Sequence, residues 1–387
     1  MWYFANPLIV FGDDALEHLS GIQGKRALIV TDRNIAKLGF AERVGNELAK
    51  AGLEYQVFDE VEPDPSVQTI KHGGQVALDY QPDWLIGLGG GSSIDAAKAI
   101  WVLYARPDQE PDAINPSEFL NLRQKAHMIA IPTTSGTGAE VTSIIVVTDV
   151  EGQRKTGVMS QEVVPDIAIL DTSLVMGLPP QITGDTGMDA LTHAIEGYTS
   201  NWRSDFTDGP ALIAIKRIFE YLPRAYNNGS DAEARMHMMH AATLASMSFG
   251  NAMAGLAHSL GHALGGLFHT PHGRAVGLFL PYTMEYLAKA TSNLYAEIAH
   301  FIGISNGSDL EATQALIDRV RNLAKTLNQP LSVREAGIEQ TTYEQALPAL
   351  VERAENEATT ITVARIPESA DLERMFRYAY EGKTVDF

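Results

Sequence analysis

The sequence predicts two domains, an α/β domain with a parallel, Rossmann-like sheet followed by an all-α domain. In the first half, β-rich runs alternate with helical stretches, which is the pattern of βαβ units with helices on both faces of a sheet. From about Pro179 the β-branched runs end, and long segments rich in Ala, Leu and Met follow. We therefore expect residues 1–180 to form the α/β domain and residues 181–387 the helical domain.

Each half contains several elements that can be placed by their patterns. The predicted strands cover residues 25–32, 55–58, 83–88 and 128–132. The centre of the first strand, Ala27 to Val30, is continuously apolar, as is typical of a strand buried on both faces. Helices carrying Leu38, Val44 and Leu48, and then residues 69–78, separate the first three strands. In the second half, the predicted helices include residues 189–198, 209–222, 231–248 and 255–265.

Composition and charge restrict the class of protein. The chain has 387 residues, of which 45% are hydrophobic and 20% charged, as in an ordinary soluble enzyme. The formal net charge of -19 disfavours nucleic acid and anionic membranes as partners, because both are negatively charged. No apolar run reaches the roughly 20 residues of a membrane span, and the first residues lack the basic start and apolar stretch of a signal peptide. We therefore expect a cytoplasmic protein.

A glycine-rich loop follows the third predicted strand. Gly89, Gly90 and Gly91 precede Ser92 and a helix that continues through Asp95. Glycine lets a backbone approach a phosphate closely, and a helix N-terminus offers free N–H groups and a favourable dipole. The loop therefore predicts a pyrophosphate site. The alternative is a plain strand-to-helix turn capped by Ser92, since the pattern is not the GxGxxG fingerprint of ordinary Rossmann domains.

Two further features lie at the ends of neighbouring strands. The run from Thr133 to Glu140 holds threonine, serine and glycine residues after the fourth strand, and loops at consecutive strand ends form the crevice where α/β sheets bind ligands. Asp32 ends the first strand, where a carboxylate can bind an adenosine ribose and repel a 2′-phosphate. These features predict a dinucleotide site that prefers NAD to NADP. The alternative for Asp32 is a solvated turn aspartate.

Histidines cluster in the second half of the chain. Four of the eleven histidines fall within fifteen residues, namely His258, His262, His269 and His272. Imidazole is the commonest metal-binding side chain at neutral pH. The chain has no cysteine, so thiolate ligands and disulfides are excluded. The cluster therefore predicts a metal site with nitrogen and oxygen ligands.

An aspartate and a histidine one helical turn apart offer the other half of such a site. Asp189 and His193 are spaced i, i+4, so on a helix their side chains share one face. Spacing alone leaves all four clustered histidines open as the remaining ligands. A set of three nitrogens and one oxygen suits Fe(II), Zn(II), Mn(II), Co(II) or Ni(II).

Four sequence motifs lie in the order in which one known family carries them. They are Gly89-Gly90-Gly91-Ser92-x-x-Asp95-x-x-Lys98, Thr133-Thr134-x-Gly136-Thr137-x-x-Glu140, Gly187-x-Asp189-Ala190-Leu191-Thr192-His193-Ala194-x-Glu196 and Gly255-Leu256-x-His258-x-x-x-His262-x-x-Gly265 continuing to Pro271-His272-Gly273. Together they resemble the iron-containing (group III) alcohol dehydrogenases, which include lactaldehyde reductases, propanediol dehydrogenases and butanol dehydrogenases. The resemblance covers about residues 5 to 380. It implies a dehydroquinate synthase-like fold, with dinucleotide binding in residues 1–180 and metal and substrate binding in residues 181–387.

The resemblance also implies roles for individual residues. It implies metal ligands at Asp189, His193, His258 and His272. It implies cofactor contacts at Asp32, Asp64, Gly90, Gly91, Ser92, Asp95, Thr133, Thr134 and Lys155. His262 falls beside the substrate rather than on the metal, Phe249 matches an aromatic residue of the substrate pocket, and His269 receives no role. Ile144 departs from the pattern, because some lactaldehyde-reducing members have a polar residue there.

Together these features predict a metal- and NAD-dependent alcohol dehydrogenase or aldehyde reductase that acts on small primary alcohols or diols. The metal, with Fe(II) favoured and Zn(II) or Mn(II) as alternatives, would act as a Lewis acid while hydride passes between alcohol carbon and nicotinamide. His262 is expected to relay the alcohol proton. The family implies a homo-oligomer, a dimer or larger. Two alternatives remain, a dehydroquinate synthase-like lyase and a non-catalytic nucleotide- or metal-binding protein.

Overall fold

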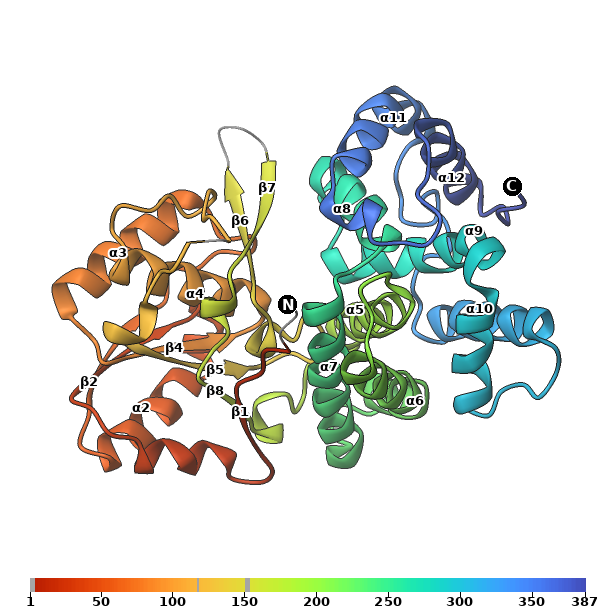
Figure 1. Cartoon of the computed structure of the whole chain (residues 1–387). Helices are drawn as coiled ribbons and strands as arrows, with labels where there is room; N and C mark the ends of the chain where they lie inside the picture. The colour runs from red at the N-terminus through yellow and green to blue at the C-terminus, as the bar shows by residue number, and fades with distance from the viewer. Residues whose placement is uncertain (1–3, 117, 150–153) are drawn as a thin grey trace. The chain divides into compact units, whose positions relative to one another are not determined.

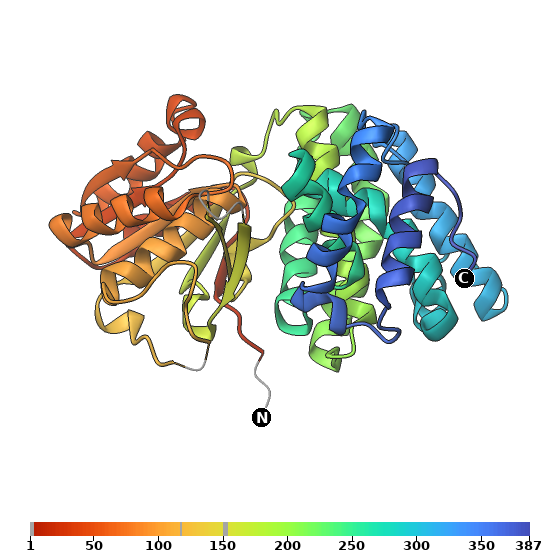
Figure 2. The ribbon, with the colours of Figure 1, turned by 90° about the horizontal axis from the view of Figure 1, so that it is seen from above.

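The computed structural model describes residues 4–116, 118–149 and 154–387. The chain divides into two compact units, Met1–Met176 and Gly177–Phe387. The first is an α/β unit around a parallel sheet and the second is helical, which confirms the predicted fold class (Figures 1 and 2). The predicted boundary after residue 180 lies at the start of α5 (Pro180–Thr199). Among the described residues, no helix has the length and apolar character needed to cross a membrane.

A parallel sheet forms the centre of the first unit. Its strands are β1 (Leu8–Phe11), β2 (Arg26–Val30), β3 (Glu54–Phe58), β4 (Trp84–Gly89), β5 (His127–Pro132) and β8 (Ile167–Leu170). They lie in the order β1-β8-β5-β4-β2-β3. From β2 the chain first adds β3 on one side and then β4 on the other. The carboxyl ends of β2 and β4 therefore flank a topological switch point, where α/β sheets bind ligands.

Helices cover both faces of this sheet. The 3-10 helix η1 (Ala15–Gly21) and helix α2 (Phe40–Lys50) share one apolar core with the sheet, and α3 (Val67–Tyr80) and α4 (Gly91–Ala105) share another (Figure 1). Because β2 and β4 lie between the two cores, they are apolar on both faces. The short helices of this unit are α1 (Arg33–Lys37), η2 (Leu122–Gln124), η3 (Ala139–Val141), η4 (Gln161–Val163) and η5 (Thr172–Leu174).

Four strands of the unit were not predicted from the sequence. β1 and β8 extend the sheet at one side, while β6 (Ile144–Asp149) and β7 (Arg154–Met159) form a separate antiparallel pair. β1 has only four residues and lies at the sheet edge, with Leu8 and Phe11 exposed. β7 begins with Arg, Lys and Thr and contains a glycine, so its apolar pattern is weak.

The second unit is a set of helices around one core. They are α5 (Pro180–Thr199), α6 (Asp205–Asn227), α7 (Ala232–Ala252), α8 (Leu256–Phe268), α9 (His272–Phe301), α10 (Asp309–Thr326), α11 (Gln340–Glu355), η6 (Ala358–Ile361) and α12 (Ser369–Glu381). The four predicted helical segments correspond to α5 to α8, and two of them begin at the N-cap residues Asp231 and Gly255. Apolar residues from all these helices except η6 join one continuous core, which positions the first turns of α8 and α9 beside α5.

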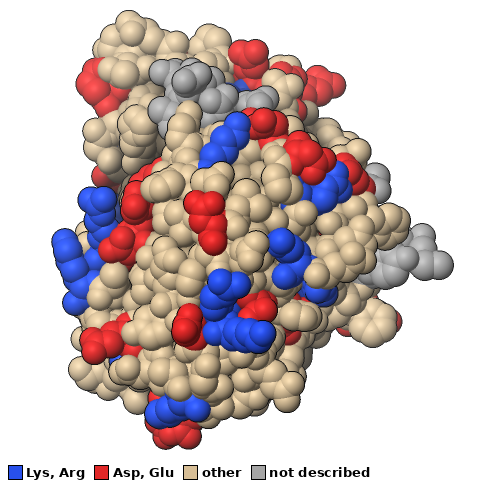
Figure 3. Space-filling view, turned by 90° about the vertical axis from the view of Figure 1, so that its left-hand side faces the viewer, with Lys and Arg blue, Asp and Glu red and all other residues tan. Residues whose placement is uncertain are grey.

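Charged side chains of both signs are mixed on the face shown in Figure 3. Lys and Arg side chains there lie next to Asp and Glu side chains, and the described residues form no continuous basic area on this face. With the net charge of -19, this face offers no extended attraction to a polyanion.

Candidate active site

The four predicted metal ligands lie together in the second unit. Asp189 and His193 come from α5, His258 from the first turn of α8, and His272 is the first residue of α9. One ligand atom from each of the four lies within 4.8 Å of the other three. We call these four residues the ligand group. Asp189, His193 and His258 are buried, while the side chain of His272 is 37% exposed.

Distances within the ligand group fit a small cation. Asp189 Oδ1 lies 3.3 Å from Nε2 of His272, 3.7 Å from that of His193 and 3.9 Å from that of His258. Ligands held tetrahedrally at about 2.1 Å from an ion lie roughly 3.4 Å from each other. His258 Nε2 is buried and has no hydrogen-bond partner among the described residues. Because buried polar atoms normally have a partner, this atom fits a metal ligand.

The histidines keep Asp189 ionised. Burial by itself raises the pKa of this carboxyl, but His193, His272 and His258 lower it by more, so the pKa of Asp189 lies below its usual range. The carboxylate is therefore available as an anionic ligand at neutral pH.

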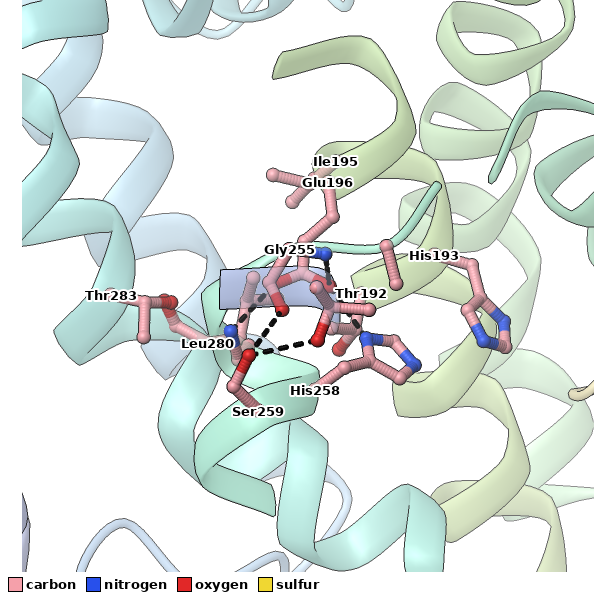
Figure 4. Close-up of polar contacts among 12 residues, drawn as sticks. Thr192, His193, Ile195, Glu196, Gly255, His258, Ser259, Leu280 and Thr283 are labelled. Atoms are coloured by element: carbon pink, nitrogen blue, oxygen red, sulfur yellow. Dashed lines mark hydrogen bonds and ion pairs between the residues drawn. The ribbon is translucent and has the colours of Figure 1, made fainter. Parts of the chain in front are cut away.

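Glu196 orients His258. It follows His193 by three residues on α5, and its Oε2 lies 2.5 Å from His258 Nδ1 (Figure 4). Burial lowers the pKa of His258, but the Glu196 carboxylate raises it by more. Because Nδ1 donates to this carboxylate, Nε2 is the atom directed to the ligand group. No role for Glu196 was predicted from the sequence, although its i, i+3 spacing from His193 places it on the same helix face.

Two glycines let helices come close enough to build the ligand group. Gly255 precedes α8, and a Cβ there would lie 3.0 Å from Glu196 Oε1. Gly273 follows His272, and a Cβ there would lie 2.2 Å from the Asp185 carbonyl oxygen. A side chain at Gly273 would overlap the backbone of α5, so glycine is needed there for α9 to pack against α5. A side chain at Gly255 would displace the Glu196 carboxylate by a few tenths of an ångström.

Phe249 lies against the ligand group. Its ring stacks on His193 with a centroid distance of 3.9 Å and an interplanar angle of 7°. The side chain is buried in α7, so it fixes the plane of the His193 ring. The role in a substrate pocket that the resemblance implied for Phe249 stays a prediction.

His262 lies next to the ligand group without joining it. It follows His258 by one turn of α8, and its ring centroid lies 5.2 Å from that of His272. Its Nδ1 is 3.4 Å from Glu357 Oε1, and its side chain is 33% exposed. Burial lowers the pKa of His262. His269 lies outside the ligand group, at the end of α8 in a left-handed conformation with φ of 54°.

The predicted cofactor residues gather at the switch point of the sheet. Asp32 follows β2, Ser92 belongs to the loop and helix start after β4, and Thr133 follows β5. These three strands are neighbours in the sheet. Asp64, between β3 and α3, donates its backbone N–H to Ser92 Oγ at 3.2 Å. The fold therefore brings residues from four loops together at the carboxyl ends of the strands.

The glycine loop packs against the threonine loop. Gly90 is the N-cap of α4, and a Cβ there would lie 3.5 Å from Thr134 Cγ2. A Cβ at Gly91 would lie 2.9 Å from Thr137 Cγ2. Glycine at position 91 therefore allows the start of α4 to pack closely against the threonine loop. Such a helix N-terminus suits a phosphate.

Two of the acidic residues that are predicted to contact the cofactor accept hydrogen bonds within the protein. Asp32 Oδ1 accepts hydrogen bonds from the N–H groups of Asn34 and Ile35, at 2.8 and 3.1 Å, and so caps α1. Its Oδ2 would lie 3.8 Å from a Cβ at Gly89, so it is directed to the glycine loop. Asp95 is buried, and its Oδ2 accepts a hydrogen bond from Val146 N–H at 3.0 Å. This bond joins α4 to β6, and a cofactor contact of Asp95 stays a prediction.

Two lysines, Lys98 and Lys155, lie near the β6–β7 pair of the first unit. Lys98, one turn after Asp95, donates from Nζ to the carbonyl oxygens of Thr142 and Ile144 at 2.8 and 3.1 Å. Burial lowers the pKa of Lys98 to about 8. The backbone of Lys155 pairs with that of Thr148 in the β6–β7 pair, while its side chain lies outside the described part of the chain.

The α/β unit has loops suited to a phosphate and the helical unit has a carboxylate–histidine ligand group, which together indicate a nucleotide- and metal-dependent protein. Residues 6–172 match the family model described as iron-containing alcohol dehydrogenase. Residues 183–380 match the model for the C-terminal part of the Fe-containing alcohol dehydrogenase family. The chain belongs to the iron-containing alcohol dehydrogenase family.

Individual relatives agree with this family. The NADPH-dependent butanol dehydrogenase of Clostridium saccharobutylicum is 39% identical over 381 residues, 98% of this chain and 98% of that protein. The bifunctional aldehyde-alcohol dehydrogenase of Escherichia coli is 38% identical over 93% of this chain, which spans only 43% of that relative's length. The crystal structure of a 1,3-propanediol oxidoreductase is 32% identical with a TM-score of 0.90, covering 98% of this chain and 100% of that one. These findings confirm the predicted family and enzyme class, and they support an alcohol dehydrogenase over the lyase and non-catalytic alternatives.

Removing a histidine of the ligand group should remove bound metal. We expect His258→Ala and His272→Ala to retain little divalent metal after dialysis, because each loses one of four ligands. Elemental analysis by mass spectrometry measures this. His269→Asn is the matched control, since asparagine tolerates the left-handed backbone found there. Unchanged metal content in both alanine variants would contradict the ligand assignment.

Weakening the support of His258 should weaken metal binding without abolishing it. We expect Glu196→Gln to lower the affinity for divalent metal roughly 10- to 100-fold, because a neutral amide holds the Nδ1 proton of His258 less strongly. Titration against a competing chelator gives the affinity. Glu297→Gln serves as the control, because Glu297 bonds the Tyr198 hydroxyl at 2.7 Å and not the ligand group. Equal affinities for wild type and Glu196→Gln would show that His258 needs no such support.

Proposed function

We propose that this protein is a metal- and NAD-dependent alcohol dehydrogenase or aldehyde reductase that acts on small primary alcohols or diols. The observation that supports this most directly is the ligand group, with one carboxylate oxygen and three imidazole nitrogens within 4.8 Å. Two of the relatives named above are a butanol dehydrogenase and a propanediol oxidoreductase. Their names favour a short primary alcohol or diol as the substrate.

Residues of the second unit would bind the metal and transfer the alcohol proton. Asp189, His193, His258 and His272 would bind a divalent ion, with Fe(II) favoured by the family and Zn(II) or Mn(II) as alternatives. A bound divalent metal supplies Lewis-acid polarisation of the substrate oxygen. His262 would transfer the alcohol proton to solvent, because its ring lies beside the ligand group and a third of its side chain is exposed.

Residues of the first unit would hold the dinucleotide. The bound nicotinamide supplies hydride exchange. The N–H groups at the start of α4 would bind the pyrophosphate, because a helix N-terminus offers free N–H groups and a favourable dipole to an anion. The proposed contacts are Asp32, Asp64, Gly90, Gly91, Ser92, Asp95, Thr133, Thr134 and Lys155. A cytoplasmic location and a homo-oligomeric state are further predictions.

Asp32 would favour NAD over NADP. Its Oδ1 caps α1 while Oδ2 is directed to the glycine loop. A fixed carboxylate at this place would accept bonds from ribose hydroxyls and repel a 2′-phosphate. The Clostridium saccharobutylicum relative is named as NADPH-dependent, so the cofactor preference of this chain rests on Asp32 rather than on that name.

Activity measurements test the proposed function. We expect the metal-loaded protein to oxidise NADH with short aldehydes such as butanal, and chelation of the metal to abolish that oxidation. The assay follows the absorbance of NADH across a panel of aldehydes and the matching alcohols with NAD. No NADH oxidation with any aldehyde in a broad panel would refute the proposal.

A substitution that removes the negative charge tests the role of Asp32. We expect wild type to have the higher kcat/KM with NADH, and Asp32→Asn to raise kcat/KM with NADPH about tenfold by removing the repulsion of the 2′-phosphate. Asparagine keeps an oxygen that can cap α1, so folding should be retained. A wild-type preference for NADPH would contradict the assignment.

A further inference from the structure

Two aspartates of α5 contact the first turn of α9 in different ways. His272 is the first residue of α9, and its Nε2 lies 3.3 Å from Asp189 Oδ1. Arg274, two residues later, donates from Nε to Asp185 Oδ1 at 3.1 Å. Asp185 and Asp189 are spaced i, i+4, so they share one face of α5. The ligand group therefore includes one of these carboxylates, and the other is paired with an arginine.

Gly273 lies between the two contacts and packs against α5. A Cβ at Gly273 would lie 2.2 Å from the carbonyl oxygen of Asp185 and 3.0 Å from Cβ of Asp189. The first turn of α9 therefore touches α5 at the turn between the two aspartates. A small rotation of α9 about this point would move His272 relative to Asp189. The position of His272 thus depends on the contacts that hold this turn in place.

The ring of His272 has less support than that of His258. Glu196 Oε2 lies 2.5 Å from Nδ1 of His258. Among the described residues, the ring of His272 has no hydrogen bond or ion pair apart from its contact with Asp189. The His272 side chain is also 37% exposed, against 4% for that of His258. The backbone of α9, rather than a bond to the ring, therefore determines where this ligand lies.

Asp185 is a buried and well-supported partner for Arg274. Its side chain is 12% exposed, and that of Arg274 is 25% exposed. Asp185 Oδ1 also accepts a hydrogen bond from Nε2 of the buried Gln329 at 2.8 Å. A carboxylate that has lost most of its water is destabilising without such partners. The pair between Asp185 and Arg274 therefore fixes the start of α9 more firmly than an exposed ion pair would.

We propose that Arg274 and Asp185 are positioning residues of the metal site, because their pair fixes the first turn of α9 and thereby holds His272 against Asp189. Asp185 itself lies outside the ligand group, and its Oδ1 already accepts bonds from Arg274 and Gln329. The inference goes beyond the proposed function, since it concerns the binding of the metal and neither the substrate nor the reaction.

Two single substitutions distinguish positioning from an effect of charge. Asp185→Ala removes a negative charge near the ligand group, and Arg274→Met removes a positive one. Charge alone would weaken the binding of a cation in the first variant and strengthen it in the second. Loss of positioning weakens binding in both. We expect each variant to bind Co(II) about tenfold more weakly than wild type, the lower end of the effect for residues that support metal ligands.

The measurement is a titration of the metal-depleted full chain with Co(II) against a competing chelator. Arg321→Met is the matched control, because Arg321 pairs with Glu285 near the middle of α9, and the side chains of that pair are 22% and 5% exposed. Chemical denaturation of the metal-free proteins gives their stability. We expect Arg274→Met and Arg321→Met to lose similar stability, but only Arg274→Met to lose affinity for Co(II).

A double substitution tests whether the pair acts through His272. In His272→Ala there is no ligand left to position, so adding Arg274→Met should change the remaining Co(II) affinity by less than about twofold. The proposal is overturned by a further tenfold loss in the double variant, by tighter binding in Arg274→Met than in wild type, or by equal losses in Arg274→Met and Arg321→Met. A wild type that binds no Co(II) would overturn it as well. Intact Co(II) binding without any alcohol or aldehyde turnover would refute the proposed function alone.

Discussion

The buried carboxylate of Glu196 links α5 to the first turn of α8 by hydrogen bonds, and the geometry of the ligand group depends on these bonds. A carboxylate removed from water is strongly destabilising unless hydrogen bonds replace its hydration. Glu196 receives such bonds from Gly255 N–H at 2.8 Å, from Ala257 N–H at 2.6 Å and from His258 Nδ1 at 2.5 Å. The N-terminus of α8 adds a favourable dipole. The bonds that compensate burial therefore also fix which nitrogen of His258 faces Asp189.

Close helix packing completes the arrangement. Gly273 allows α9 to approach the backbone of α5, so that His272 reaches Asp189, and Phe249 stacks on His193 from α7. The first unit shows a comparable use of buried charge, because Asp95 and Lys98 bond the backbone near the start of β6. In both units, charged side chains that bond to backbone groups position the loops and helices around a proposed ligand. The chemistry that we propose requires both sets of residues.

Much of this arrangement could be predicted from the sequence. The rest could not be predicted, for physical reasons. Helical spacing alone paired Asp189 with His193, and strand–helix alternation predicted the parallel sheet. Spacing could not choose among the clustered histidines, because the choice depends on how α8 and α9 pack against α5. The edge strand β1 and the β6–β7 pair were not predicted, because their apolar patterns are short or weak. Glu357 lies about a hundred residues beyond His258 and becomes visible as a neighbour of His262 only in three dimensions.

The central claim is that one divalent metal is bound by Asp189, His193, His258 and His272. The most direct test is a crystal structure of the metal-loaded protein with an anomalous difference map recorded at the absorption edge of that metal. Our account predicts one strong peak per chain, about 2.1 Å from a carboxylate oxygen of Asp189 and from one ring nitrogen of each histidine. A fully loaded crystal in which the peak lies away from these residues, or in which one of them is replaced as a ligand by His262, would contradict it.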